Sequence, residues 1–244
     1  MGAKAFYSDP IDDIYWTLVE QFTIDSKREI EKLVKEVEPF FKKHKKHFSF
    51  YLTPYDRRRN VDKYLKELGY KITAKDNFMF LEKGHLKRRD LSLQSGVTLK
   101  EIKTDKDNEI YIDCYTRAYT SNPEDAYFNF GAEGVYEGIY RKTWKDHSLR
   151  KKMRKFVGFY KGKPASCGAI YFGNKLGYIA EVGTDNEFRR KGLARAVSLV
   201  CINAGIDEGC SVILLGTEKD TPAEKLYQSL GFVSKTVFWG MSRV

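Results

Sequence analysis

Three basic residues and a glycine stand together where a predicted strand gives way to a helix. They are Arg189, Arg190, Lys191 and Gly192, in the stretch TDNEFRRKGLARAV that spans residues 184–197. The first turn of a helix has unpaired N–H groups and a positive dipole end. A glycine lets a ligand come close to the backbone. Because anions bind at such positions, the stretch predicts a phosphate or pyrophosphate site.

The spacing in this stretch differs from the two common nucleotide-binding loops. It lacks the Gly-Lys-Ser/Thr ending of a Walker loop, and it lacks the Gly-x-Gly-x-x-Gly dinucleotide fingerprint. Arg189, Gly192 and Ala194 instead form the pattern Arg-x-x-Gly-x-Ala. The end of the preceding strand, Val182 to Thr184, can offer backbone groups to an extended ligand.

The elements that position this loop can be read from periodicity and turn signals. Three β-rich runs separated by Gly, Asn and Pro precede it, and a helix with apolar residues at i, i+3, i+4 and i+7 begins near Leu193. Gly209 is the expected C-cap of that helix. The order of elements predicts an α/β (α+β) fold with a mixed, mostly antiparallel sheet flanked by helices. The predicted strands are 97–103, 156–160, 165–172, 177–184, 210–216 and 234–241, and the predicted helices are 109–122, 134–148, 193–209 and 221–231.

The N-terminal third predicts a smaller α/β region with the same helix-strand-helix-strand order as the C-terminal end. YLKELGY at residues 64–70 also aligns with LYQSLGF at residues 226–232. We interpret the region as a degenerate half copy, although any short amphipathic helix ending in Leu-Gly-aromatic would look alike. The expected domains are residues 1–93 and 94–244. The predicted elements of the first are 26–44, 48–54, 61–70 and 78–83, with a linker at 84–96.

Two motifs in this order resemble the GNAT superfamily of N-acetyltransferases. Arg189 to Ala194 is similar to the family's acyl-CoA pyrophosphate loop, Gln/Arg-x-x-Gly-x-Gly/Ala. AEKLYQSLGF, Ala223 to Phe232, looks like its later helix, Ala-x-x-Leu-Tyr-x-x-x-Gly-Phe. The resemblance covers about residues 97–244. It implies a GNAT-type sheet, acyltransferase activity and acetyl-CoA as co-substrate.

The resemblance also implies roles for individual residues. Tyr227 matches the tyrosine that protonates the leaving thiolate, although a half-buried aromatic on an amphipathic helix is the alternative. Glu181, on the strand before the loop, is the candidate base, but it could instead face away from the cleft and pair with a lysine. Leu65 stands in the position of Tyr227, which implies that the N-terminal half has lost acyl-CoA binding. The residues expected to hold acyl-CoA are Val182, Gly183, Thr184, Arg189, Arg190, Lys191, Gly192, Leu193, Ala194 and Arg195.

The acceptor is expected to be a primary amine of a small molecule, an amino acid or a peptide. In the family the two early helices and their loop line the acceptor pocket. Here residues 115–140 are rich in Tyr and Phe and carry four acidic residues, which would suit a cationic amine. The ordinary core of two amphipathic helices explains the aromatic residues equally well. The acidic residues are Glu124, Asp125, Glu133 and Glu137.

Composition limits the remaining function classes. The 244 residues carry a formal net charge of +10, which favours anionic partners, but the basic runs are typical of solvated faces and make nucleic acid an unlikely partner. Four scattered cysteines and four histidines give no metal-ligand spacing, so no metal is expected. No apolar run could span a bilayer, and the default location is cytoplasmic. A monomer or a homodimer is expected.

Two alternatives to an enzyme stay open at this point. A GNAT-like fold could sense acyl-CoA without turnover and regulate a partner, although the retained Tyr227 argues against it. The basic charge could instead indicate a nucleic-acid- or ribosome-associated protein, whose binding would fall steeply with salt.

Overall fold

The structure is a computed structural model that describes residues 2–9, 11, 16–24, 26–120 and 134–243. The chain divides into two compact units, and neither is one continuous stretch. The boundary expected between residues 93 and 94 does not coincide with this division, and the two expected domains stay a prediction. Unit 1 comprises Met1–Phe78, Thr217–Glu224 and Ser234–Val244, and unit 2 comprises Met79–Gly216 and Lys225–Val233.

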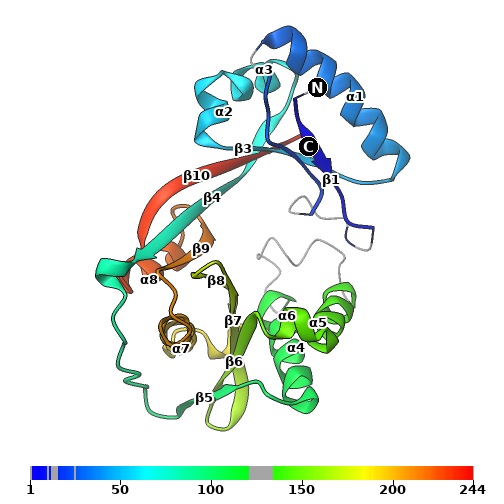
Figure 1. Ribbon diagram of the computed structural model, residues 1–244. Helices are drawn as coiled ribbons and strands as arrows, with labels where there is room; N and C mark the ends of the chain where they lie inside the picture. The colour runs from blue at the N-terminus through cyan, green and yellow to red at the C-terminus, as the bar shows by residue number, and fades with distance from the viewer. Residues whose placement is uncertain (1, 10, 12–15, 25, 121–133, 244) are drawn as a thin grey trace. The chain divides into compact units, whose positions relative to one another are not determined.

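Unit 1 is built on strands in the order β1-β2-β3-β10-β4. Helix α1 packs on them through the predicted apolar stripe, since Ile30, Leu33, Val34, Val37 and Phe41 are all buried. The elements are β1 Lys4–Phe6, β2 Leu18–Glu20, α1 Lys27–Lys43, β3 Ser49–Leu52, α2 Pro54–Arg58, α3 Val61–Glu67, β4 Lys71–Glu82 and β10 Val233–Ser242. Figure 1 draws α1, α2 and α3 in blue to cyan and β10 in red.

Four features of unit 1 differ from the sequence-based expectation. β4 begins at Lys71, whereas the predicted strand begins at Phe78. Residues 71–76 alternate between exposed and half-buried, so they lack the buried apolar face by which a strand is predicted. The five-residue helix α2 was not predicted. It is held by a capping box in which Thr53 and Asp56 bond each other's backbone N–H. The three-residue strands β1 and β2 are too short to give a pattern.

The ends of α3 and α8 share one local geometry, as the half-copy interpretation expects. Tyr70 N–H donates to the Leu65 carbonyl at 3.0 Å, and Phe232 N–H donates to the Tyr227 carbonyl at 3.1 Å. The intervening glycines have φ of +89° and +88°. Both are therefore Schellman-type helix ends that require glycine. The likeness supports a repeat at these turns, and the half copy as a whole stays a prediction.

Unit 2 has strands in the order β9-β8-β7-β6-β5, antiparallel except for the parallel pair β8–β9. Figure 1 shows α4, α5 and α6 on one face of β6–β8 and α7 on the other. The expected mixed, mostly antiparallel α/β fold is confirmed. The elements are β5 Val97–Glu101, α4 Asp105–Thr120, α5 Val135–Lys145, α6 His147–Arg150, β6 Met153–Tyr160, β7 Lys163–Gly173, β8 Leu176–Thr184, η3 Asn186–Phe188, α7 Leu193–Asp207, β9 Val212–Glu218 and α8 Pro222–Ser229, with η1 Lys83–His85 before them.

Strand β8 changes its pairing halfway along. Its parallel pairing with β9 ends at Ile179 and Leu215, whereas its pairing with β7 continues to Thr184. The β7 register shifts opposite Glu181, whose φ of +60° marks a bulge. The second half of β8 therefore has a strand partner on one side only.

Close helix packing surrounds this bulge and depends on two glycines. A Cβ on Gly168 would lie 2.4 Å from Val197 of α7. A Cβ on Gly183 would lie 2.8 Å from Ala118 of α4. Both helices therefore lie against the bare backbone at the bulge.

The segment at residues 84–96, expected to be a linker, is fastened along α7. Arg89 N–H donates to Asn203 Oδ1 at 2.8 Å, and Asn203 Nδ2 donates to the Arg89 carbonyl at 2.9 Å. Asn203 is 5% exposed, and Leu86 and Leu91 pack against the core. The segment is thus an ordered part of unit 2.

We predict that Asn203→Ala loosens this segment. Two hydrogen bonds to half-buried backbone groups are lost, so the free energy of unfolding should fall by about 1–3 kcal/mol in urea titrations. Limited trypsin digestion should also cut faster after Arg88 and Arg89. The control is Arg88→Ala, which removes only an exposed ion pair with Asp207 and should cost less than about 1 kcal/mol. Equal losses in the two variants would contradict the prediction.

Candidate functional site

The loop predicted to bind an anion lies between β8 and α7. The side chains of Arg189 and Lys191, on either side of Arg190, bond backbone carbonyls nearby. Arg189 Nε donates to Thr184 O at 3.3 Å, and Lys191 Nζ donates to Glu187 O at 2.7 Å. Arg190 and Gly192 have φ of +64° and +73°. These bonds and left-handed residues fold the loop tightly in front of the helix.

The backbone N–H groups at the N-terminus of α7 are open to a hydrogen-bond acceptor. Its first intrahelical bond runs from Ala196 N–H to Gly192 O at 3.0 Å, and no side chain caps the helix. The N–H groups of Leu193, Ala194 and Arg195 therefore have no partner of this kind. The Leu193 side chain is 1% exposed and anchors the turn in the core. This geometry fits a pyrophosphate held mainly by backbone N–H groups.

Arg195 is exposed and donates from Nη1 to Ser229 Oγ at 3.0 Å. That bond ties the first turn of α7 to the last turn of α8. The expected cofactor-binding residues from Arg189 to Arg195 thus come together in one loop and one helix turn. The side chains of Arg189, Lys191 and Arg195 bond the protein itself, whereas that of Arg190 is exposed.

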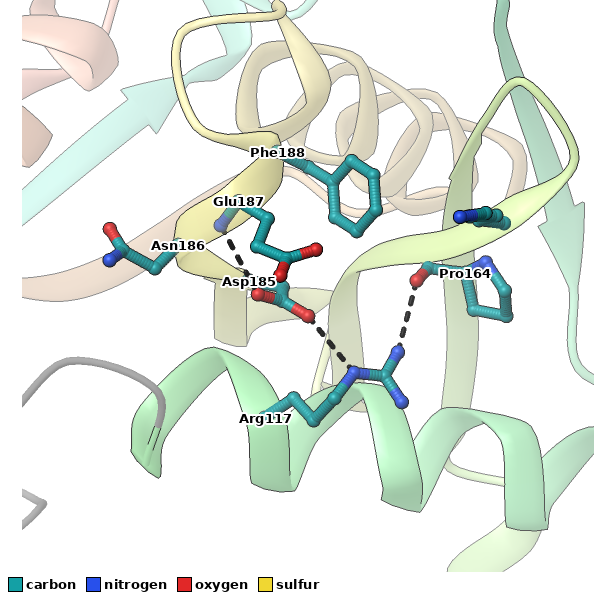
Figure 2. Close-up of a pocket in the computed structure, with 7 residues that line it drawn as sticks. Arg117, Pro164, Asp185, Asn186, Glu187 and Phe188 are labelled. Carbon is teal, nitrogen blue, oxygen red and sulfur yellow. Dashed lines mark hydrogen bonds and ion pairs between the residues drawn. The ribbon is translucent and has the colours of Figure 1, made fainter.

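A partly buried ion pair fixes the point where the loop leaves β8. Asp185 is 6% exposed, and its backbone N–H donates to the Ala165 carbonyl at 3.0 Å. Figure 2 shows Arg117 of α4 bridging Asp185 and Pro164, with Nε 2.9 Å from Asp185 Oδ2 and a second nitrogen 3.0 Å from Pro164 O. Arg117 was missed from the sequence because its partners are distant along the chain. A pocket of 650 Å³ here is lined by Arg117, Lys163, Pro164, Asp185, Asn186, Glu187 and Phe188.

The strand end expected to pair with an extended ligand is partly engaged. The Val182 carbonyl accepts from Tyr119 Oη at 3.2 Å, and the Gly183 carbonyl accepts from Ser166 Oγ at 2.6 Å. Ser166 Oγ also lies 3.0 Å from Thr184 Oγ1. These bonds hold the half of β8 that β9 does not pair with. A ligand strand at Val182 would share its carbonyl with Tyr119.

Glu181 lies on the face of the sheet that α4 covers. Tyr111 of α4 donates its hydroxyl to Oε2, and Tyr171 of β7 donates to Oε1. Burial raises the pKa of Tyr111 and Tyr171 well above that of an ordinary phenol, and the nearby Glu181 carboxylate raises it further. Both phenols therefore stay protonated and keep donating to the carboxylate.

A buried lysine lies near the Glu181 carboxylate, which resembles the alternative expectation that Glu181 pairs with a lysine. Lys155 of β6 is 1% exposed, and its Nζ lies 4.7 and 4.8 Å from the ring centres of Tyr111 and Tyr140. Asn108 Oδ1 is 3.5 Å from Nζ. Burial lowers the pKa of Lys155, and the Glu181 carboxylate opposes that shift. Cation–π contacts and the carboxylate thus offset part of the cost of burying this charge.

Tyr227 lies on the opposite side, against α7. It is 7% exposed, and burial raises the pKa of its hydroxyl, with Cys201 adding to the rise and a side-chain hydrogen bond with Ser198 opposing it. Burial raises the pKa of the Cys201 thiol of α7, and the Glu181 carboxylate raises it further. Tyr227 therefore holds its proton at neutral pH. Tyr227 and Glu181 thus lie on opposite faces of the sheet.

The aromatic region expected to line the acceptor pocket is partly outside the described residues. Glu124, Asp125 and Glu133 fall there. Glu137 accepts from Thr116 Oγ1 at 3.0 Å. The described tyrosines pack on one another, with Tyr115 and Tyr140 ring centres 4.7 Å apart and both residues 8% exposed. In the described part, the core interpretation of these aromatic residues is the better one.

No cluster of three or more His, Cys, Asp or Glu side chains within the described residues could hold a metal ion. Within the same residues, every helix falls short of the length and hydropathy that crossing a bilayer requires.

Comparison with known proteins places this geometry. The model of the acetyltransferase (GNAT) family matches residues 108–232, just over half of the chain. A mycothiol acetyltransferase of Kocuria rhizophila is 28% identical over 152 residues, which cover 59% of this chain and 48% of that protein. The chain thus spans about half the length of the curated relatives it matches.

Solved structures share the fold at low identity. A GCN5-related N-acetyltransferase of Sphaerobacter thermophilus superposes with a TM-score of 0.73 at 14% identity, covering 98% of this chain and 75% of that one. A tandem GNAT protein from the clavulanic acid biosynthesis pathway superposes with a TM-score of 0.60 at 13% identity, covering 93% and 75%.

We predict that Lys155→Met changes how stability depends on pH. Because burial holds the pKa of Lys155 below 10.5, the folded chain binds fewer protons than the unfolded chain in the window beneath that value. Wild-type stability should therefore gain from rising pH there, and the variant should lack that gain. Urea titrations at about pH 7 and about pH 9.5 should show the free energy of unfolding of wild type increasing relative to the variant.

The control for this measurement is Lys152→Met, because Lys152 is exposed on the turn before β6. Its stability should keep a constant offset from wild type across the same pH range. A constant offset for Lys155→Met as well would show that the buried lysine titrates normally.

Proposed function

Because the chain belongs to the acetyltransferase (GNAT) family, we propose that it transfers an acetyl group from acetyl-CoA to a primary amine. The acceptor would be a small molecule, an amino acid or a peptide. The observation that carries the proposal is the uncapped N-terminus of α7, set beside the half of β8 that has lost its β9 partner. A helix N-terminus suits a pyrophosphate, and a strand with one open side suits an extended arm.

Acyl-CoA would be held by the residues that the structure gathers here. The backbone N–H groups from Gly192 to Arg195 would take the pyrophosphate. The open side of β8 from Val182 to Thr184 would receive the pantetheine arm. Arg117 and Asp185 would act indirectly, since they fix the exit of the loop from the strand. Preorganised donors of this kind need no rearrangement when the ligand arrives.

Glu181 would take the proton that the amine loses. Its carboxylate is fixed by Tyr111 and Tyr171 on the α4 face, which is the side of the two early helices. Each carboxylate oxygen has lone pairs beyond the one its tyrosine uses, so the group can still accept from an amine or from one intervening water. The bulge at Glu181 turns the backbone there away from regular strand geometry.

Tyr227 would give a proton to the departing thiolate. Its raised pKa keeps the phenol protonated, which a general acid requires. Because Tyr227 lies on the α7 face, the acid and the base would act from opposite faces of the sheet. The amine would approach from the α4 face, where the carbon–nitrogen bond forms. The thiol would leave toward α7 as the carbon–sulfur bond breaks.

The acceptor class is the least constrained part of the proposal. Relatives named mycothiol acetyltransferases favour a small-molecule acceptor over a peptide. The net charge of +10 suits acyl-CoA itself, which is an anion, so it needs no nucleic-acid partner to explain it. Cytoplasmic location and a monomer or homodimer stay as expectations.

Unit 1 would not bind acyl-CoA. Leu65, in the position of Tyr227, is fully buried in the core of unit 1 and has no proton to give. The N-terminal half also lacks an Arg-x-x-Gly-x-Ala loop. The fold likeness to a tandem GNAT protein supports a degenerate half whose role is structural.

We predict that acetyl-CoA stabilises the protein and that Ala194→Glu abolishes the effect. A ligand at a hundred times its dissociation constant adds about 2.7 kcal/mol, a clear rise in melting temperature. Ala194 is in the first turn of α7, where a carboxylate favours the helix but repels phosphate. The variant should therefore fold normally and show no shift with acetyl-CoA. Gly192 is less suitable, because its φ of +73° would strain any replacement.

The control for this experiment is Ser148→Glu, which makes the same charge change in the first turn of α6. Acetyl-CoA should raise its melting temperature as in wild type. No shift with wild type would remove the basis of the proposed function.

We predict that Tyr227→Phe slows turnover about 10- to 100-fold without weakening acetyl-CoA binding, since general acid catalysis contributes at least that much. The measurement is free-thiol release with a panel of small amines, amino acids and peptides, beside calorimetric titration of acetyl-CoA. Tyr55→Phe, at a tyrosine 64% exposed on unit 1, is the control. Unchanged thiol release in Tyr227→Phe would exclude the acid role and favour a binding protein.

A further inference from the structure

A glutamine from the segment at residues 84–96 lies directly on the glycine that starts α7. A Cβ built on Gly192 would stand 2.8 Å from Cδ of Gln94, 3.0 Å from its Nε2 and 3.1 Å from its Oε1. The side-chain amide of Gln94 therefore rests against the Gly192 backbone. Any anion on the first-turn N–H groups of α7 would have this amide as a neighbour.

The backbone that carries Gln94 is fixed on both sides. Val97 N–H donates to the Gln94 carbonyl at 3.0 Å, and Lys161 N–H donates to the Gly96 carbonyl at 2.7 Å. Upstream, the paired bonds between Arg89 and Asn203 hold the segment to α7. The side chain itself is exposed, and within the described residues its amide has no hydrogen-bond partner. The fixed backbone therefore presents a side-chain donor that a ligand can bind.

Three of the four cations from Arg189 to Arg195 are engaged with the chain itself. Arg189 Nε, Lys191 Nζ and Arg195 Nη1 donate to Thr184, Glu187 and Ser229, whereas Arg190 is exposed. The backbone N–H groups of the first turn point along one axis only. A pyrophosphate has more acceptor oxygens than that turn can serve, and a glutamine amide adds two further N–H groups.

We propose that Gln94 is a further acyl-CoA-binding residue, whose side-chain amide donates to the pyrophosphate held on the first turn of α7. The inference rests on the proposed function, because it assumes that acyl-CoA binds there. The segment that joins the N-terminal third to the rest of the chain then contributes directly to the cofactor site.

The test is calorimetric titration of acetyl-CoA into wild type, Gln94→Ala and Gln94→Glu at two salt concentrations. Loss of one exposed hydrogen bond to an anion should weaken binding roughly threefold to tenfold in Gln94→Ala. Gln94→Glu has the same shape but adds a negative charge, so binding should weaken by about tenfold or more at low salt and recover partly at high salt. Gln21→Glu, an exposed glutamine of unit 1, makes the same charge change and should bind as wild type does.

The outcomes separate this inference from the proposed function. If wild type binds acetyl-CoA and Gln94→Ala binds it equally well or more tightly, the amide only covers Gly192 and the inference is overturned. If wild type does not bind acetyl-CoA, the proposed function fails as well. 3′-Dephospho-CoA should show the same loss as CoA in Gln94→Glu. A loss confined to ligands with a 3′-phosphate would overturn the assignment to the pyrophosphate.

Discussion

The site depends on one change in strand pairing. β8 is bonded on both sides as far as Ile179, and beyond that it keeps only β7. Unpaired backbone groups are costly inside a protein, so a strand in this position needs other partners. Tyr119 of α4 bonds the Val182 carbonyl, while Ser166 and Cys167 of β7, the strand that stays paired, bond the carbonyls of Gly183 and Glu181. The side that β9 leaves unpaired is where the proposed extended ligand would add.

The two side chains proposed as acid and base, Tyr227 and Glu181, lie on opposite faces of the sheet. At φ +60° the Glu181 backbone leaves the strand pattern, and its carboxylate is taken up by tyrosines on the α4 face. On the α7 face, Gly168 lets α7 approach closely, and Tyr227 packs beyond it through Ser198 and Cys201. The sheet itself thus lies between these two side chains.

Sequence reasoning worked where a local signal carried the structure. Gly192, Leu193 and the apolar period after them located α7, and Pro222 and Gly231 bracketed α8, because caps and periodicity are properties of short stretches. It failed where the partner lay far along the chain. Lys155 is the last residue of a basic run, and nothing near it in sequence indicates its contacts with the rings of Tyr111 and Tyr140. Gln94 and Arg117 were missed for the same reason, and β4 was placed too late because its first half has no buried face.

The path of the last strand has a consequence for how this chain is made. β10 pairs with β3 in unit 1, so the sheet of that unit needs residues 234–243 as well as the first eighty. A ribosome delivers residues 234–243 only after it has delivered residues 1–233. Nearly all strands and helices of unit 2 precede residue 234 in the sequence. Unit 1 lacks β10, the strand that pairs with β3, until those last residues are made. The unit that contains residues 2–78 is therefore completed after most of the unit that follows it in sequence.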